Sequence, residues 1–97
     1  MAAYVIAEID VRDPEIYRAY TALTPASVAR HGGRFIVRGG PAAALEGEPP
    51  KRVVVVEFAD AEAARRWYDS RDYREARAIR EKAAVSRLFI VEGAPPG

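Results

Sequence analysis

The segment that most constrains the fold of this chain is RVVVVEF, Arg52–Phe58. Its run of β-branched residues predicts a strand. Neighbouring side chains of a strand point to opposite faces of the sheet, so the valines divide between both faces. A strand with one face in water would alternate apolar and polar residues instead. This strand therefore needs cover on both sides.

Similar apolar runs predict three more strands, at residues 3–11, 34–38 and 86–93. Asp60 and Ser70 are typical N-caps, and they predict helical pieces over 61–69 and 71–84. Residues 39–51 read as a loop with a short extended piece at 43–46. We expect one domain over residues 1–93 and a flexible tail over 94–97.

The first helix begins with the sequence DPE, in which Asp13 is the predicted N-cap and Pro14 the first helical residue. Ile16, Tyr20 and Leu23 follow at helical spacing and predict its buried stripe. Pro25 removes a backbone donor, so we expect a kinked helix that ends near His31.

The resulting order is β-α-β-β-α-β. Right-handed crossovers then give an α+β fold of the ferredoxin-like kind, an antiparallel sheet with its helices on one face and residues 3–11 and 52–58 in its centre. The other face would expose valine, isoleucine and phenylalanine side chains in one patch, which soluble monomers rarely do. We therefore predict a homodimer that packs its two open sheet faces together in a barrel-like assembly.

Composition excludes several classes of function. A formal net charge of +1 argues against nucleic-acid binding. The absence of cysteine excludes disulfides and thiolate chemistry, and a single histidine argues against a metal site. The apolar runs are far shorter than the ~20 residues of a membrane span. We expect a cytoplasmic protein with no membrane, metal or cofactor requirement.

The chain resembles the dimeric α/β-barrel superfamily and, within it, domain-of-unknown-function family 1330. The segments that carry the resemblance run nearly end to end and include DPE, GGRFIVRGG, LEG at 45–47, RVVVVEF, WYDSRDY at 67–73 and the terminal VEG. The resemblance implies two ferredoxin-like subunits with opposed sheets. Related branches include cofactor-independent monooxygenases, muconolactone isomerases and haem-dependent enzymes, but no catalytic motif of theirs matches here.

Two candidate site residues in HGGRFIVRGG, His31 and Arg38, each come directly before a glycine pair. His31 either caps the preceding helix through its dipole or acts as a general acid or base at the mouth of a cleft. If Phe35 and Val37 face the helices, alternation along 34–38 directs Arg38 toward the opposing sheet. There it would either pair with Glu8, Asp10 or Glu57 across the dimer interface or hold the carboxylate or enolate of a ligand.

Further candidates follow from the carboxylates and aromatic residues. Glu57 or Glu8 could serve as a base if an apolar cleft raised its proton affinity. Tyr68 and Tyr73 either complete the core or offer a phenol to a ligand. Arg80 lies near the apolar stripe of its helix, and we expect it to reach a carboxylate.

These residues support two classes of function. One is a small-molecule enzyme in which Arg38 anchors an anionic group and His31, Glu57 or Glu8 moves a proton. The other is a non-catalytic ligand-binding or interaction dimer with the same cleft.

Overall fold

A computed structural model describes residues 1–96, and Gly97, part of the predicted tail, lies outside the described residues. The sheet has the strand order β2-β3-β1-β4, and every neighbouring pair is antiparallel. This topology confirms the predicted ferredoxin-like fold and its two central strands. The elements are β1 (Ala3–Val11), α1 (Pro14–Arg30), β2 (Arg34–Arg38), β3 (Arg52–Phe58), α2 (Ala61–Asp69), α3 (Arg71–Ala83) and β4 (Ala84–Glu92).

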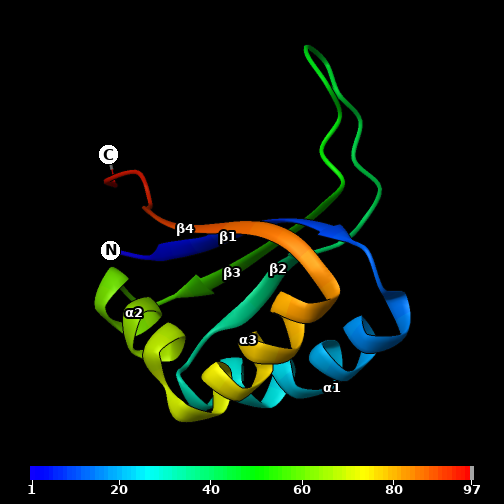
Figure 1. Cartoon of the computed structure of the whole chain (residues 1–97). Helices are drawn as coiled ribbons and strands as arrows, with labels where there is room; N and C mark the ends of the chain where they lie inside the picture. The colour runs from blue at the N-terminus through cyan, green and yellow to red at the C-terminus, as the bar shows by residue number, and fades with distance from the viewer. Residues whose placement is uncertain (97) are drawn as a thin grey trace.

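All three helices cover the same face of the sheet (Figure 1). The alternating burial of β1 shows the consequence, because Val5, Ala7 and Ile9 are buried under the helices while their neighbours face the other way. Helix α1 packs beside α3, and α2 lies over β1 and β3. No helix within residues 1–96 is long and apolar enough to cross a membrane.

The uncovered side of the sheet, which we call the open face, is apolar in its centre. Val37, Val55, Ile6 and Phe89 are register partners and form one row across all four strands. Val55 and Ile6 are partly exposed, and Phe89 is 37% exposed. We call these four residues the central apolar row. Nothing within residues 1–96 covers them.

Helix α1 ends at Arg30, beside the predicted end at His31, but the side that it buries differs from the prediction. It is continuous through Pro25, and the hydroxyl of Thr24 lies 3.5 Å from the Thr21 carbonyl oxygen that the missing proline N–H would have bonded. The predicted stripe is wrong at two of its three positions, because Ile16 and Leu23 are 39% and 44% exposed, whereas Tyr20 is buried as predicted. The helix is rotated so that a more polar set faces the sheet: Tyr17, Tyr20, Thr24, Ser27 and Val28.

The connection between β2 and β3 is a long excursion that rises away from the helices (Figure 1). The extended piece predicted at residues 43–46 is not a strand, and residues 40–51 are all exposed. A strand needs a neighbour for its backbone groups, and this segment has none within residues 1–96.

The three helices begin where their capping residues predicted. Asp13, Asp60 and Ser70 cap their helices as predicted, each accepting a hydrogen bond from the backbone N–H three residues ahead. Strand β4 begins two residues earlier than predicted, directly after α3.

Gly33 allows α1 and β3 to approach each other. A Cβ atom there would lie 2.6 Å from Cε1 of Phe58 and 2.9 Å from Cγ1 of Val28, both in the core. Gly40 has no atom within 4 Å of the same position and no positive φ.

We predict that Gly33→Ala lowers the free energy of unfolding by about 1–3 kcal/mol, because the added methyl overpacks a fixed ring. The matched substitution Gly40→Ala should change it by less than about 0.5 kcal/mol. Urea denaturation followed by Trp67 fluorescence measures both. Equal effects would show that the packing at Gly33 is not as tight as the structure indicates.

Candidate functional site

A cleft lies between α1 and the helix-covered face of the sheet. Its walls are apolar apart from threonine and tyrosine hydroxyls and two arginines. Its enclosed space is about 30 Å³, enough for about one or two water molecules. The lining residues come from α1 (Tyr17, Tyr20, Thr21, Thr24, Val28), the sheet (Val5, Ala7, Ile9, Phe35, Arg38, Arg52, Val54, Val56, Leu88) and Trp67.

Arg38 lies at this cleft and not on the open face, which corrects the sequence prediction. The register between β2 and β3 shifts after Phe35, so that Val37 pairs with Val55 and Arg38 with Val54. A bulge of this kind inserts one residue and reverses which side chains face each side. The guanidinium of Arg38 consequently stacks over the Phe35 ring, 4.3 Å from its centroid.

Arg52 is the second cation of the cleft, and sequence reasoning missed it. It follows the alternation of β3, so its side chain shares the face of Val54 and Val56. Its guanidinium packs against Gly39, where a Cβ atom would collide with it, and lies 5.5 Å from the centroid of the Tyr17 ring. Its Nε is buried without a hydrogen-bond partner in residues 1–96.

Neither arginine has a recorded partner of opposite charge. The ion pairs found within residues 1–96 join Arg12, Arg30, Arg34, Arg66 and Arg87 to carboxylates, and they leave out Arg38 and Arg52. No aspartate or glutamate lines the cleft. The cleft therefore concentrates positive charge at one end of an apolar space.

Two tyrosines and an arginine are joined by hydrogen bonds between their buried side chains behind the cleft. Arg80 Nη1 donates to the Tyr73 hydroxyl at 2.8 Å, and that hydroxyl lies 2.9 Å from the Tyr20 hydroxyl. Burial raises the pKa of both phenols, and at Tyr73 the neighbouring Tyr20 raises it further. Both tyrosines are therefore protonated near neutral pH and act as hydrogen-bond donors, not as bases.

The environment of Arg80 differs from the sequence expectation. It is 5% exposed, yet no carboxylate pairs with it, and its Nε has no partner in the described residues. Its guanidinium lies 5.9 Å from the Tyr20 ring centroid. The phenol of Tyr73 takes the place of the expected carboxylate. Neither Arg80 nor Tyr73 lines the cleft, so both can reach a ligand there only through Tyr20.

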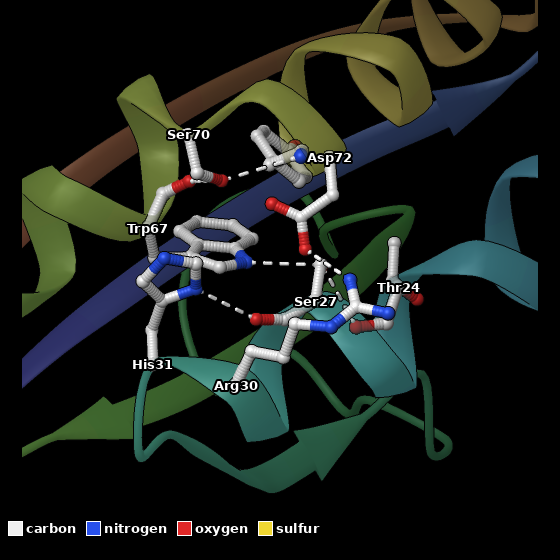
Figure 2. Close-up of polar contacts among 8 residues, drawn as sticks. Thr24, Ser27, Arg30, His31, Trp67, Ser70 and Asp72 are labelled. Carbon is white, nitrogen blue, oxygen red and sulfur yellow. Dashed lines mark hydrogen bonds and ion pairs between the residues drawn. The ribbon is translucent and has the colours of Figure 1, made fainter.

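His31 lies at the C-terminal end of α1 and outside the cleft lining. Its Nδ1 is 2.9 Å from the carbonyl oxygen of Ser27, as Figure 2 shows. The hydroxyl of Ser27 accepts a hydrogen bond from Trp67 Nε1 at 3.2 Å, which ties α1 to α2. This geometry matches the capping interpretation of His31.

Glu57 and Glu8 lie on the open face and not in the cleft. Glu57 pairs with Arg34 at 2.7 Å, and Glu8 pairs with Arg87 at 3.1 Å. The two ion pairs border the central apolar row on either side. Since each carboxylate already has a cation in its own chain, the face can be covered without burying an unpaired charge.

Tyr68 lines a different hollow, of about 380 Å³, between α2 and β4. The guanidinium of Arg77 stacks over the Tyr68 ring, 4.7 Å from its centroid. The structure therefore separates the predicted ligand-binding residues, with Arg38 at the cleft, Tyr73 and Arg80 behind it, and Tyr68 elsewhere. No group of three or more metal-ligating side chains occurs within residues 1–96.

The fold and this cleft define an α+β protein of the ferredoxin-like class with a small cationic pocket between sheet and helices. Residues 2–94 match the sequence profile of the domain of unknown function DUF1330, and the chain belongs to that family. This confirms the resemblance inferred from the sequence. None of the curated proteins matches the chain.

Solved structures share the fold. A protein of unknown function from Rhodopseudomonas palustris has a TM-score of 0.75 at 24% identity, covering 98% of this chain and 84% of its own. SnoaB, a cofactor-independent oxygenase from Streptomyces nogalater, has a TM-score of 0.71 at 15% identity, covering 98% and 95%. A dimeric ferredoxin-like protein of unknown function from Bacteroides fragilis has a TM-score of 0.65 at 12% identity, covering 95% and 96%.

We predict that Tyr73→Phe lowers the free energy of unfolding by about 1–3 kcal/mol or more, because it removes the one recorded acceptor of a buried guanidinium. Tyr20→Phe is the matched control, since it deletes a buried phenol but keeps that acceptor, and its effect should be smaller. Urea denaturation at neutral pH compares them. A larger loss of unfolding free energy for Tyr20→Phe would contradict the assignment of Tyr73 as the hydrogen-bond partner of Arg80.

Proposed function

We propose that the protein binds a small apolar molecule bearing a carboxylate or enolate in the cleft between α1 and the sheet. The observation that carries this proposal is the presence of Arg38 and Arg52 at an apolar cleft without a carboxylate partner. A guanidinium stabilises such an anion through two parallel hydrogen bonds, and the apolar walls contact the rest of the molecule.

Binding in this cleft requires its mouth to open, because the enclosed space is only about 30 Å³. Arg38 is exposed and rests on Phe35 without a recorded hydrogen bond. It can therefore turn from the ring to a ligand by changing rotamer. Arg52 has an unpartnered buried Nε that a ligand oxygen would satisfy. The stacking contact that Arg38 gives up at this exposed position is weaker than the charge-assisted hydrogen bond that it gains.

Tyr20 is the third residue to which we assign a role. Arg80 donates to Tyr73, so the proton of Tyr73 is free to bond the Tyr20 oxygen. The Tyr20 proton then remains available for an oxygen atom of the ligand. In this proposal Arg80 and Tyr73 are positioning residues that act through Tyr20.

Binding without turnover is the form of the proposal that the cleft supports best. A cleft that has donors and cations but no carboxylate or histidine contains no group suited to remove a proton. The roles first considered for His31, Glu8 and Glu57 as proton carriers therefore have no geometric support.

Cofactor-independent oxygenation is a second candidate, favoured by the cationic cleft itself. Two of the similar structures are a cofactor-independent oxygenase and a putative antibiotic biosynthesis monooxygenase. Arginines and a phenol that stabilise a substrate anion would suit such chemistry. Oxygen consumption with a bound enolisable ligand, measured with an oxygen electrode, distinguishes this candidate from binding alone.

We further propose that the protein is a homodimer joined through its open faces. The central apolar row and its bordering ion pairs support this, since they form a face that is apolar in the middle and internally neutral at its margins. Burying such a row against a second copy removes apolar area from water on both chains. We also assign the protein to the cytoplasm, as the composition suggests.

The ligand proposal predicts that benzoate and hexanoate raise the melting temperature, whereas benzamide and hexanamide do not. Arg38→Ala and Arg52→Ala should each weaken carboxylate binding by about tenfold to a hundredfold, because each removes a charge-assisted hydrogen bond. Arg74→Ala, which removes an exposed α3 arginine, is the control. Titration by calorimetry measures the affinities. Equal binding by all variants would refute the assigned site.

The dimer proposal predicts that Ile6→Asp yields a monomer, because it places a charge in the centre of the apolar row. Ala19→Asp, on the exposed side of α1, adds the same charge and should leave the assembly intact. Sedimentation velocity at micromolar concentration compares the two. If Ile6→Asp keeps the mass of the unmodified protein, the open face is not the interface.

A further inference from the structure

The connection between β2 and β3 projects away from the rest of the molecule (Figure 1). We call residues 40–51 the β2–β3 arm. All of them are exposed, and none takes part in a backbone hydrogen bond within residues 1–96. Leu45 is 98% exposed, far more than any other large apolar side chain described. Long connections without secondary structure are uncommon in compact domains and are usually either functional segments or flexible linkers.

The sequence of the arm suits a fixed projection better than a flexible loop. Pro41, Pro49 and Pro50 restrict the backbone of both its limbs, which lowers the entropy lost when the arm is held in place. Gly47 has a φ of +75° and forms the turn near the tip. An apolar run, Ala42–Leu45, therefore follows the first of these stiffened limbs and ends with Leu45 near the tip.

The arm borders the open face. It rises on the side of the sheet opposite the helices (Figure 1). At its base, Pro49 and Pro50 line a hollow together with Glu8 and Arg87, which lie on the open face. Any molecule that covers the central apolar row must therefore lie beside the arm.

The length of the arm exceeds the thickness of one sheet layer. Each limb has about six residues and spans roughly 20 Å when extended. Packed sheets lie about 10 Å apart. The tip would thus pass the sheet of a second copy and reach that copy's helices. The helical layer carries exposed arginines that are outside the ion pairs described above, namely Arg65, Arg71 and Arg74, and Glu46 lies beside Leu45 near the tip of the arm.

We infer that the β2–β3 arm is an intermolecular strap: it extends past the open face, packs against the helical layer of a second copy of this chain, and buries Leu45 there. This inference rests on the proposed dimer. In this inference the tip of the arm meets a helical surface that carries these exposed arginines, with Glu46 as their counter-charge, and the interface becomes larger than the two sheet faces alone.

The absence of cysteine makes a site-specific probe straightforward. Leu45→Cys labelled with acrylodan reports the polarity around the tip. In the otherwise unmodified dimer we expect blue-shifted emission, and in the Ile6→Asp background we expect the emission of a water-exposed dye. The same label in the two backgrounds provides the control for effects of the dye itself.

The outcomes separate the arm from the dimer. A dimer in which the dye remains water-exposed would overturn the strap and leave the proposed interface standing. A monomer in every background would overturn the dimer and the strap together.

A second measurement does not depend on a label. Leu45→Ala should weaken dimerisation by about tenfold or more, the effect of losing one buried leucine side chain. Ala42→Ser, lower on the arm, is the control and should have little effect. An unchanged dissociation constant for Leu45→Ala would contradict burial of the tip.

Discussion

One constraint governs this molecule: its sheet is apolar on both faces, and its helices cover only one. Strand β3 carries valines on each side, and α1, α2 and α3 all pack on the side of Val54, Val56 and Phe58. The open face is left with a row of four apolar side chains between two internal ion pairs. The proposed dimer and the strap that extends it both follow from this asymmetry.

The cleft depends on a local irregularity in the same sheet. A single bulge in β2 turns Arg38 from the open face to the helix-covered face, where it joins Arg52. The left-handed backbone of Gly39 leaves room for the Arg52 guanidinium, so the glycine after β2 supports the cation at the start of β3. One stretch of sequence, residues 38–52, thus contributes both arginines of the cleft and the arm beside the open face.

Most of the fold could be predicted from local patterns. Strand β3 was predicted with its observed bounds, and the capping residues Asp13, Asp60 and Ser70 start the helices they were expected to start. The strand order followed from handedness alone. The predictions failed on which side of an element faces the core. The buried side of α1 could not be read from apolar spacing, because tyrosine, threonine and serine side chains occupy it.

The candidate site was less accessible from sequence for the same reason. Strict alternation along β2 placed Arg38 on the wrong face of the sheet, because no residue of RFIVR predicts the bulge between Phe35 and Val37. Alternation along β3 did contain the signal for Arg52, which lies in phase with the buried valines. Arg80 was expected to meet a carboxylate, but the phenol of Tyr73 on the same helix meets it instead. The contact of Tyr73 with Tyr20, 53 residues away in sequence, depends on how α1 and α3 pack, which no local pattern encodes.

The central claim is that this open face belongs against a second copy of the chain. Sedimentation equilibrium of the unmodified protein across micromolar concentrations tests it most directly. The account predicts a single species of twice the 10.7 kDa chain mass. A stable species of one chain mass throughout that range would contradict it.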